Sequence, residues 1–118
     1  MICAVYDRPN HRVTVKGHAG AAPHGEDLVC AAVSALLCTL AEAVRRLERN
    51  HQVEQAEIRL MAGDAEISFV SEYECMVNTV VDTVCLGLEC MAEQYPQHMR
   101  FEVIRWARDE DAGVRPCD

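Results

Sequence analysis

Alternation of apolar and polar residues predicts a β-hairpin at the start of the chain. Residues 2–6 are rich in β-prone side chains, and residues 12–16 alternate between polar and apolar positions, as a half-buried strand does. Pro9 and Asn10 lie between the two runs and favour a turn. The two runs are therefore predicted to pair with each other.

The same period of two residues recurs in the second half of the sequence. Residues 57–60 and 66–69 alternate like strands, and Gly63 and Asp64 between them predict the turn of a second hairpin. A last strand is predicted at residues 101–106.

Apolar residues at helical spacing predict a first helix over residues 28–48. Asp27 stands at its N-cap position, where the carboxylate is expected to accept the backbone amide of Val29 or Cys30. The apolar stripe of this helix repeats at intervals of three and four residues and consists of Val33, Leu37, Leu40, Val44 and Leu47.

A second helix is predicted to open at Ser71 and to end before Pro96. Ser71 and Glu74 have the spacing of a capping box, and proline at position 96 cannot continue a helix. The expected apolar stripe consists of Tyr73, Val77, Val80, Val84, Leu88, Met91 and Tyr95.

Together these elements predict an α+β fold in the order β-β-α-β-β-α-β, with two helices packed on a mainly antiparallel sheet. A length of 118 residues suits a single domain. We assign that domain to residues 1–108, and we interpret the polar residues 109–118 as a flexible C-terminal tail.

Composition and charge argue against several classes of function. The formal net charge of −8 disfavours direct binding of nucleic acid, because a phosphate backbone requires a basic surface. Apolar runs fall short of the ~20 residues that span a bilayer, and the N-terminus does not resemble a signal peptide. We therefore expect a cytoplasmic protein that does not bind membranes.

The seven cysteines do not predict a disulfide framework, because their number is odd and their spacing irregular. No Cys-x-x-Cys pair is present, and His18, His24 and Cys30 match no zinc-binding pattern. We therefore expect no metal site. Most of the cysteines are expected to be small buried side chains.

Cys30 and His18 are the strongest candidates for covalent chemistry. At the start of a helix, the dipole and free backbone amides stabilise a thiolate and offer donors to an oxyanion. His18 follows the second predicted strand, and the glycine-rich loop at residues 17–27 is long enough to bring it back to Cys30. A structural core cysteine and a surface histidine without a role are the alternatives.

Other residues near this pair are candidates for supporting roles. Asp27 either caps the helix or orients His18 as the third member of a triad, and the two roles are compatible. Ser34 lies on the same helical face as Cys30 and either donates a hydrogen bond in the site or bonds its own backbone. The loop is predicted to move over substrate, and its assigned residues are Gly20, His24 and Gly25. An exposed histidine without a role is the alternative for His24.

Two segments in this region resemble the signature of the ribosomal-processing cysteine protease family Prp, also called the YsxB family. These are GHAG at residues 17–20 and GEDLVCAAVSAL at residues 25–36. Ala21 departs from the family pattern, in which many members carry an aromatic residue, and Leu28 replaces the commoner isoleucine. Neither departure falls on a catalytic position of the family.

The resemblance implies a protease that removes the N-terminal extension of a large-subunit ribosomal protein. The family's catalytic histidine and cysteine match His18 and Cys30, and its accompanying aspartate and serine match Asp27 and Ser34. The resemblance also implies a homodimer of α/β or α+β fold, a mobile loop over the site, and no cofactor. An acidic surface suits the basic N-terminus of such a substrate.

Two other functions remain open from the residues alone. The first is a non-catalytic, ribosome-associated binding module in which Cys30 is structural. The second is a metal-dependent or redox protein, which the missing Cys-x-x-Cys pair makes less favourable.

Overall fold

The computed structural model describes residues 1–20 and 27–106. Its elements are β1 (Ile2–Asp7), β2 (Arg12–Lys16), α1 (Leu28–Arg49), β3 (Glu54–Met61), β4 (Asp64–Val70), α2 (Glu74–Gln94) and β5 (Met99–Ile104). The predicted order β-β-α-β-β-α-β and the α+β class are therefore confirmed. The tail predicted at residues 109–118 lies outside the described residues.

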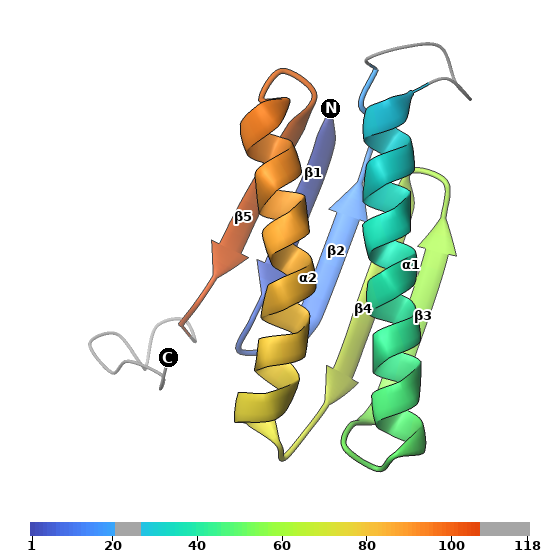
Figure 1. Ribbon diagram of the computed structural model, residues 1–118, viewed down its shortest axis with the longest axis vertical. Coiled ribbons are helices and arrows are strands. Elements are labelled where there is room, and N and C mark those ends of the chain that lie inside the picture. Colours follow the sequence, from blue (N-terminus) through green and yellow to red (C-terminus); the bar gives the residue numbers. More distant parts are fainter. Residues whose placement is uncertain (21–26, 107–118) are drawn as a thin grey trace.

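All five strands belong to one sheet in the order β3-β4-β2-β1-β5. In the described part of the chain, β1 and β5 run parallel, whereas the other neighbouring strands are antiparallel. Both helices lie side by side on the same face of the sheet (Figure 1). The two predicted hairpins and the mainly antiparallel sheet are thus present.

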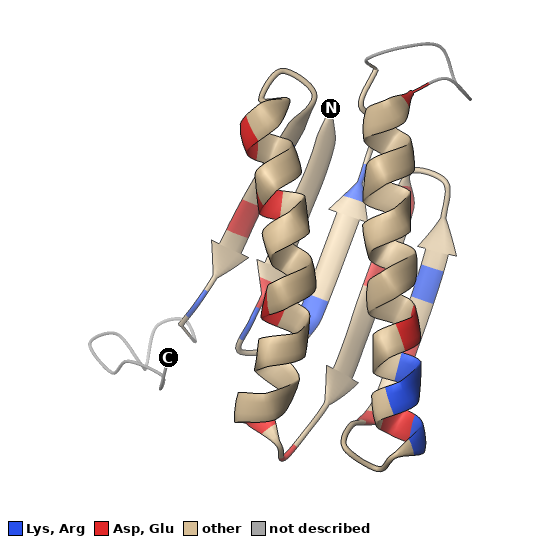
Figure 2. Ribbon diagram, viewed as in Figure 1, with Lys and Arg blue, Asp and Glu red and all other residues tan. Residues whose placement is uncertain are grey.

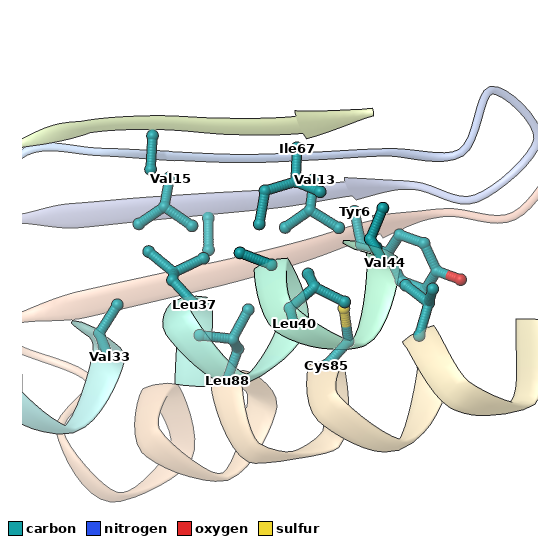
Figure 3. Close-up of a cluster of buried hydrophobic side chains, with 14 of the residues drawn as sticks. Tyr6, Val13, Val15, Val33, Leu37, Leu40, Val44, Ile67, Cys85 and Leu88 are labelled. Carbon is teal, nitrogen blue, oxygen red and sulfur yellow. The ribbon is translucent and has the colours of Figure 1, made fainter. Parts of the chain in front are cut away.

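The hydrophobic core fills the space between the helices and the covered face of the sheet (Figure 3). Val13, Val15 and Ile67 contribute from the strands. Four of the five residues predicted for the α1 stripe are buried, namely Val33, Leu37, Leu40 and Val44, and Leu47 is partly buried. Each fully buried aliphatic side chain contributes about 1.5–3 kcal/mol, so this packing holds α1, and with it Cys30, against the sheet.

The stripe predicted for α2 is partly wrong. Tyr73 and Tyr95 at its two ends are 56% and 41% exposed. Valines occupy both positions 80 and 81, and the pattern of spacings did not show that Val81 is the one that faces the sheet. The buried residues of α2 are Val77, Val81, Cys85 and Leu88.

The capping box predicted at Ser71 is also wrong. α2 begins at Glu74, and its N-cap residue Tyr73 makes no side-chain hydrogen bond to the helix. The Ser71 hydroxyl instead donates to the Gln52 carbonyl oxygen at 2.7 Å and accepts the Tyr73 amide at 3.0 Å. The Ser71 side chain therefore bonds the loop that follows α1 instead of capping α2.

Two element boundaries differ from the predicted ones, because the residues there pair with strands from other parts of the sequence. The β3–β4 turn occupies residues 62–63, and Asp64 is already part of β4, where it pairs with Met61 and Lys16. β5 begins at Met99, which pairs with Ile2 of β1 and is 1% exposed. The predicted turn and last strand therefore lay one and two residues too far along the chain.

The expectation that most cysteines are buried is wrong for the described residues. Cys85 is the buried one among them, and its burial raises the pKa of the thiol to about 12. Cys30 is half-buried. The exposed cysteines are Cys3, Cys38, Cys75 and Cys90. A thiol is small enough to occupy the solvent side of a strand or helix, so residue type did not indicate burial here.

The expectation that no apolar segment is long enough to span a bilayer is wrong for the two helices. By length and composition alone, α1 and α2 would each be able to cross a membrane. Core helices of folded domains meet the same criterion, and each of these helices packs one side against the sheet. Their apolar character is therefore weak evidence for a membrane segment.

Candidate active site

A pocket of about 600 Å³ lies between the N-terminal half of α1, the end of β2 and the β3–β4 turn. It brings together residues that are far apart in the sequence. Every predicted site residue that the structure describes lines it, namely His18, Gly20, Asp27, Cys30 and Ser34. His24 and Gly25 lie outside the described residues.

Cys30 lies in the first turn of α1, and Asp27 caps that turn as predicted. One carboxylate oxygen of Asp27 accepts the Val29 amide at 3.0 Å and the Cys30 amide at 3.1 Å. Asp27 itself is buried. The cap fixes the start of the helix, and therefore the position of the thiol at the wall of the pocket.

Three backbone amides at the start of α1 already have hydrogen-bond partners. The amides of Val29 and Cys30 donate to the Asp27 side chain, and the Ala31 amide donates to the Asp27 carbonyl oxygen at 3.1 Å. The donor beside the sulfur comes from a different segment, because the Ala19 amide donates to Cys30 Sγ at 3.3 Å. The segment that follows β2 therefore supplies a backbone donor at the sulfur.

His18 follows β2, and its position depends on two glycines that have positive φ. Gly17 has φ +94°, and a side chain there would overlap the Met1 carbonyl oxygen. The Gly17 amide donates to the Gly63 carbonyl oxygen at 2.9 Å. The imidazole of His18 packs on Gly63, where an added Cβ would lie 2.6 Å from Nε2. The β3–β4 turn therefore acts as a platform for the ring.

The remaining wall of the pocket is mostly apolar. Leu37 and Cys38 contribute from α1, whereas Leu60 and Met61 contribute from the end of β3. Met61 is 65% exposed, so the apolar wall continues to the surface. A polar end that contains the thiol and the imidazole, joined to an apolar wall, suits an extended peptide with an apolar side chain.

Sequence reasoning missed the contributions of Gly63 and Ala19. Gly63 was assigned only to a turn, and Ala19 only to a loop motif. The positive φ of +73° at Gly63 is compatible with the turn assignment, but the contact with His18 joins residues from separate hairpins. No local pattern in the sequence reports such a contact.

Asp27 variants separate the capping role from a role of the charge. Asp27→Ala is expected to lower the free energy of unfolding by about 1 kcal/mol, whereas Asp27→Asn is expected to lose only a few tenths, because asparagine also caps helices well. Urea denaturation measures both changes. If Asp27→Asn destabilises the protein as much as Asp27→Ala, capping by the side chain does not account for the stability that Asp27 provides.

The fold and the site together define a class of protein. A thiol in the capped first turn of a helix, with an imidazole lining the same pocket and an amide bonded to the sulfur, is typical of enzymes that use a cysteine nucleophile. The sequence profile of the family "Cysteine protease Prp" matches residues 1–100. This chain belongs to the Prp family and is a cysteine protease.

Relatives of known sequence or structure agree with this assignment. The ribosomal processing cysteine protease Prp of Mycoplasma pneumoniae is 30% identical over 93 residues, which cover 79% of this chain and 87% of the relative.

Crystal structures of the essential ribosomal processing protease Prp from S. aureus share the fold. The complex with a covalently linked product peptide has a TM-score of 0.70 at 22% identity, and the complex with a substrate peptide has 0.65 at 21%. Each match covers 87% of this chain and 97% of the S. aureus chain. SMU.848 from Streptococcus mutans matches with a TM-score of 0.61 at 24% identity, over 87% of this chain and 91% of that protein.

Proposed function

We propose that this cysteine protease removes the N-terminal extension of a large-subunit ribosomal protein, with Cys30 as nucleophile and His18 as general base. The observation that carries the proposal is the pocket lined by both residues, in which the Ala19 amide also bonds the sulfur. The relatives named as ribosomal processing proteases support the substrate class. The net charge of −8 favours approach of a basic segment.

The proposed reaction uses the side chains already present in the pocket. His18 takes the proton of the Cys30 thiol, and the thiolate attacks the carbonyl carbon of the scissile peptide bond. The resulting oxyanion needs backbone donors, and the Ala19 amide is the one beside the sulfur. Protonated His18 then gives its proton to the leaving amine. Water hydrolyses the thioester and restores the free thiol.

Cleavage of a synthetic peptide tests this proposal. The substrate covers the extended N-terminus of the ribosomal protein from the same genome, and the matched control peptide begins at the mature N-terminus. We expect the protein to cut the extended peptide at one bond, located by mass spectrometry, and to leave the control peptide intact. If the folded protein cuts neither peptide and alkylation of Cys30 is slow, a non-catalytic binding module is the better account.

We also propose that the protein is a homodimer and that it associates through the outer surface of its helices. α1 carries no charged residue from Leu28 to Ala41 (Figure 2), and Leu28 in this stretch is 81% exposed. On α2, the large side chain of Leu86 is 58% exposed. We infer the surface from these features, because association surfaces carry contiguous exposed apolar area with few charges.

Sedimentation equilibrium tests the dimer and its surface. Wild type is expected at twice the mass of the chain, and Leu86→Lys is expected to shift the population toward monomer. Val70→Lys is the matched control, because Val70 is 48% exposed at the end of β4. A monomeric wild type, or equal weakening by both substitutions, would contradict the proposal.

We propose that the protein acts in the cytoplasm. A reducing compartment keeps the proposed nucleophile as a thiol. It also suits the exposed free cysteines of residues 1–20 and 27–106, namely Cys3, Cys38, Cys75 and Cys90. Fractionation of cells with detection of the native protein tests this proposal, and recovery in the membrane fraction would contradict it.

A further inference from the structure

Both backbone polar groups of Ala19 form hydrogen bonds with side chains, one from the start of α1 and one from the residue before β5. Its amide donates to Cys30 Sγ at 3.3 Å, and its carbonyl oxygen lies 3.0 Å from His98 Nδ1. The residue is buried, with 3% of its surface exposed. A carbonyl oxygen only accepts hydrogen bonds, so His98 must carry a proton on Nδ1.

His98 is itself fixed by backbone contacts to two elements. Its amide donates to the Tyr95 carbonyl oxygen at 2.9 Å, at the end of α2, and its carbonyl oxygen accepts the Ile2 amide at 2.8 Å. The next residue, Met99, begins β5 and is 1% exposed. The imidazole therefore extends toward Ala19 from the junction of α2, β1 and β5.

The segment that His98 contacts contains two glycines, and its other backbone bonds are made at Gly17 and His18 rather than at Ala19. Ala19 lies between Gly17 and Gly20, which have φ values of +94° and +68°. Glycine adopts a positive φ readily, but it can also adopt many other backbone conformations. A fixed hydrogen-bond donor at the Ala19 carbonyl oxygen restricts the rotations that would turn the Ala19 amide away from sulfur.

We infer that His98 is a positioning residue for the proposed reaction: it holds Ala19 so that the Ala19 amide faces the Cys30 sulfur. The inference rests on the proposed roles of Cys30 and His18, and it assigns no proton transfer to His98. Loss of one hydrogen bond of ordinary strength corresponds to a factor of about ten in an equilibrium or a rate.

The test compares two substitutions that differ in a single property. His98→Phe keeps a ring of similar size but removes the donor. His98→Asn places an amide nitrogen at the position of Nδ1 and keeps the donor. His51→Asn is the control, because His51 is an exposed histidine after the far end of α1, with φ +60°, a conformation that asparagine tolerates.

Two quantities are measured for each variant. The first is kcat and KM for the extended peptide. The second is the rate of alkylation of Cys30 by iodoacetamide, resolved by mass spectrometry with exposed Cys75 as internal reference. For His98→Phe we expect kcat and the Cys30 alkylation rate each to fall about tenfold, while KM and the Cys75 rate stay unchanged. His98→Asn and His51→Asn are expected to behave like wild type.

The outcomes separate this inference from the proposed function. If wild type cuts the peptide and Cys30 reacts faster than Cys75, but His98→Phe equals wild type, the inference is wrong and the proposed function stands. Equal losses in His98→Phe and folded His98→Asn would likewise overturn it, because the donor would not be the property that acts. If wild-type Cys30 reacts no faster than Cys75 and no peptide is cut, the proposed function itself fails.

Discussion

Cys30→Ala is expected to lower kcat/KM for the extended peptide by about 10⁴-fold or more, since removal of a nucleophile from a catalytic unit has effects of this size. That factor corresponds to about 5.5 kcal/mol of transition-state stabilisation. Without sulfur there is no covalent intermediate, and the Ala19 amide loses its partner. His18→Ala should approach the same residual rate, because the two residues act as one unit.

Cys90→Ala is the matched control for this experiment. Cys90 is an exposed cysteine on α2, and it is not among the residues that line the pocket of Cys30. Its loss should leave kcat/KM within about twofold of wild type, as expected for a surface change outside the reacting groups. Cleavage by Cys30→Ala at the wild-type rate would contradict the assignment of the nucleophile, provided that both proteins have the same melting temperature.

Gly63→Ala is expected to lower kcat by about 10²-fold, the scale of effect when a catalytic group is displaced by about 1 Å. An added Cβ would lie 2.6 Å from His18 Nε2, so the imidazole must move. The φ of +73° at this position adds strain of about 1–2 kcal/mol for any residue with a side chain. Steady-state cleavage of the extended peptide measures the loss of kcat.

A double-substitution cycle separates the clash with the ring from backbone strain. The strain is the same whether or not the imidazole is present, whereas the clash disappears in a His18→Ala background. Gly63→Ala is therefore expected to cost less unfolding free energy in that background than in wild type. Equal costs in both backgrounds, together with an unchanged kcat in the single variant, would show that Gly63 does not position the ring.

Local patterns predicted most of the fold and part of the site. Both hairpins and both helices follow from residues that are neighbours in sequence, and the Asp27 cap was predicted because its two bonds reach only two and three residues ahead. Two of the predictions that were wrong, at Ser71 and at the start of β5, concern groups whose partners Gln52 and Ile2 belong to other segments.

The chain alone is sufficient to indicate a thiol at a capped helix start, a histidine after a strand and a glycine-rich segment between them. It did not reveal that the Ala19 amide faces the sulfur, that Gly63 supports the imidazole, or that His98 reaches Ala19 from 79 positions away. The last two contacts exist because β5 pairs in parallel with β1 and because the β3–β4 hairpin adds to β2. Sheet pairing of this kind joins distant segments through backbone hydrogen bonds, which every residue type except proline can donate, so the side-chain pattern carries little record of them.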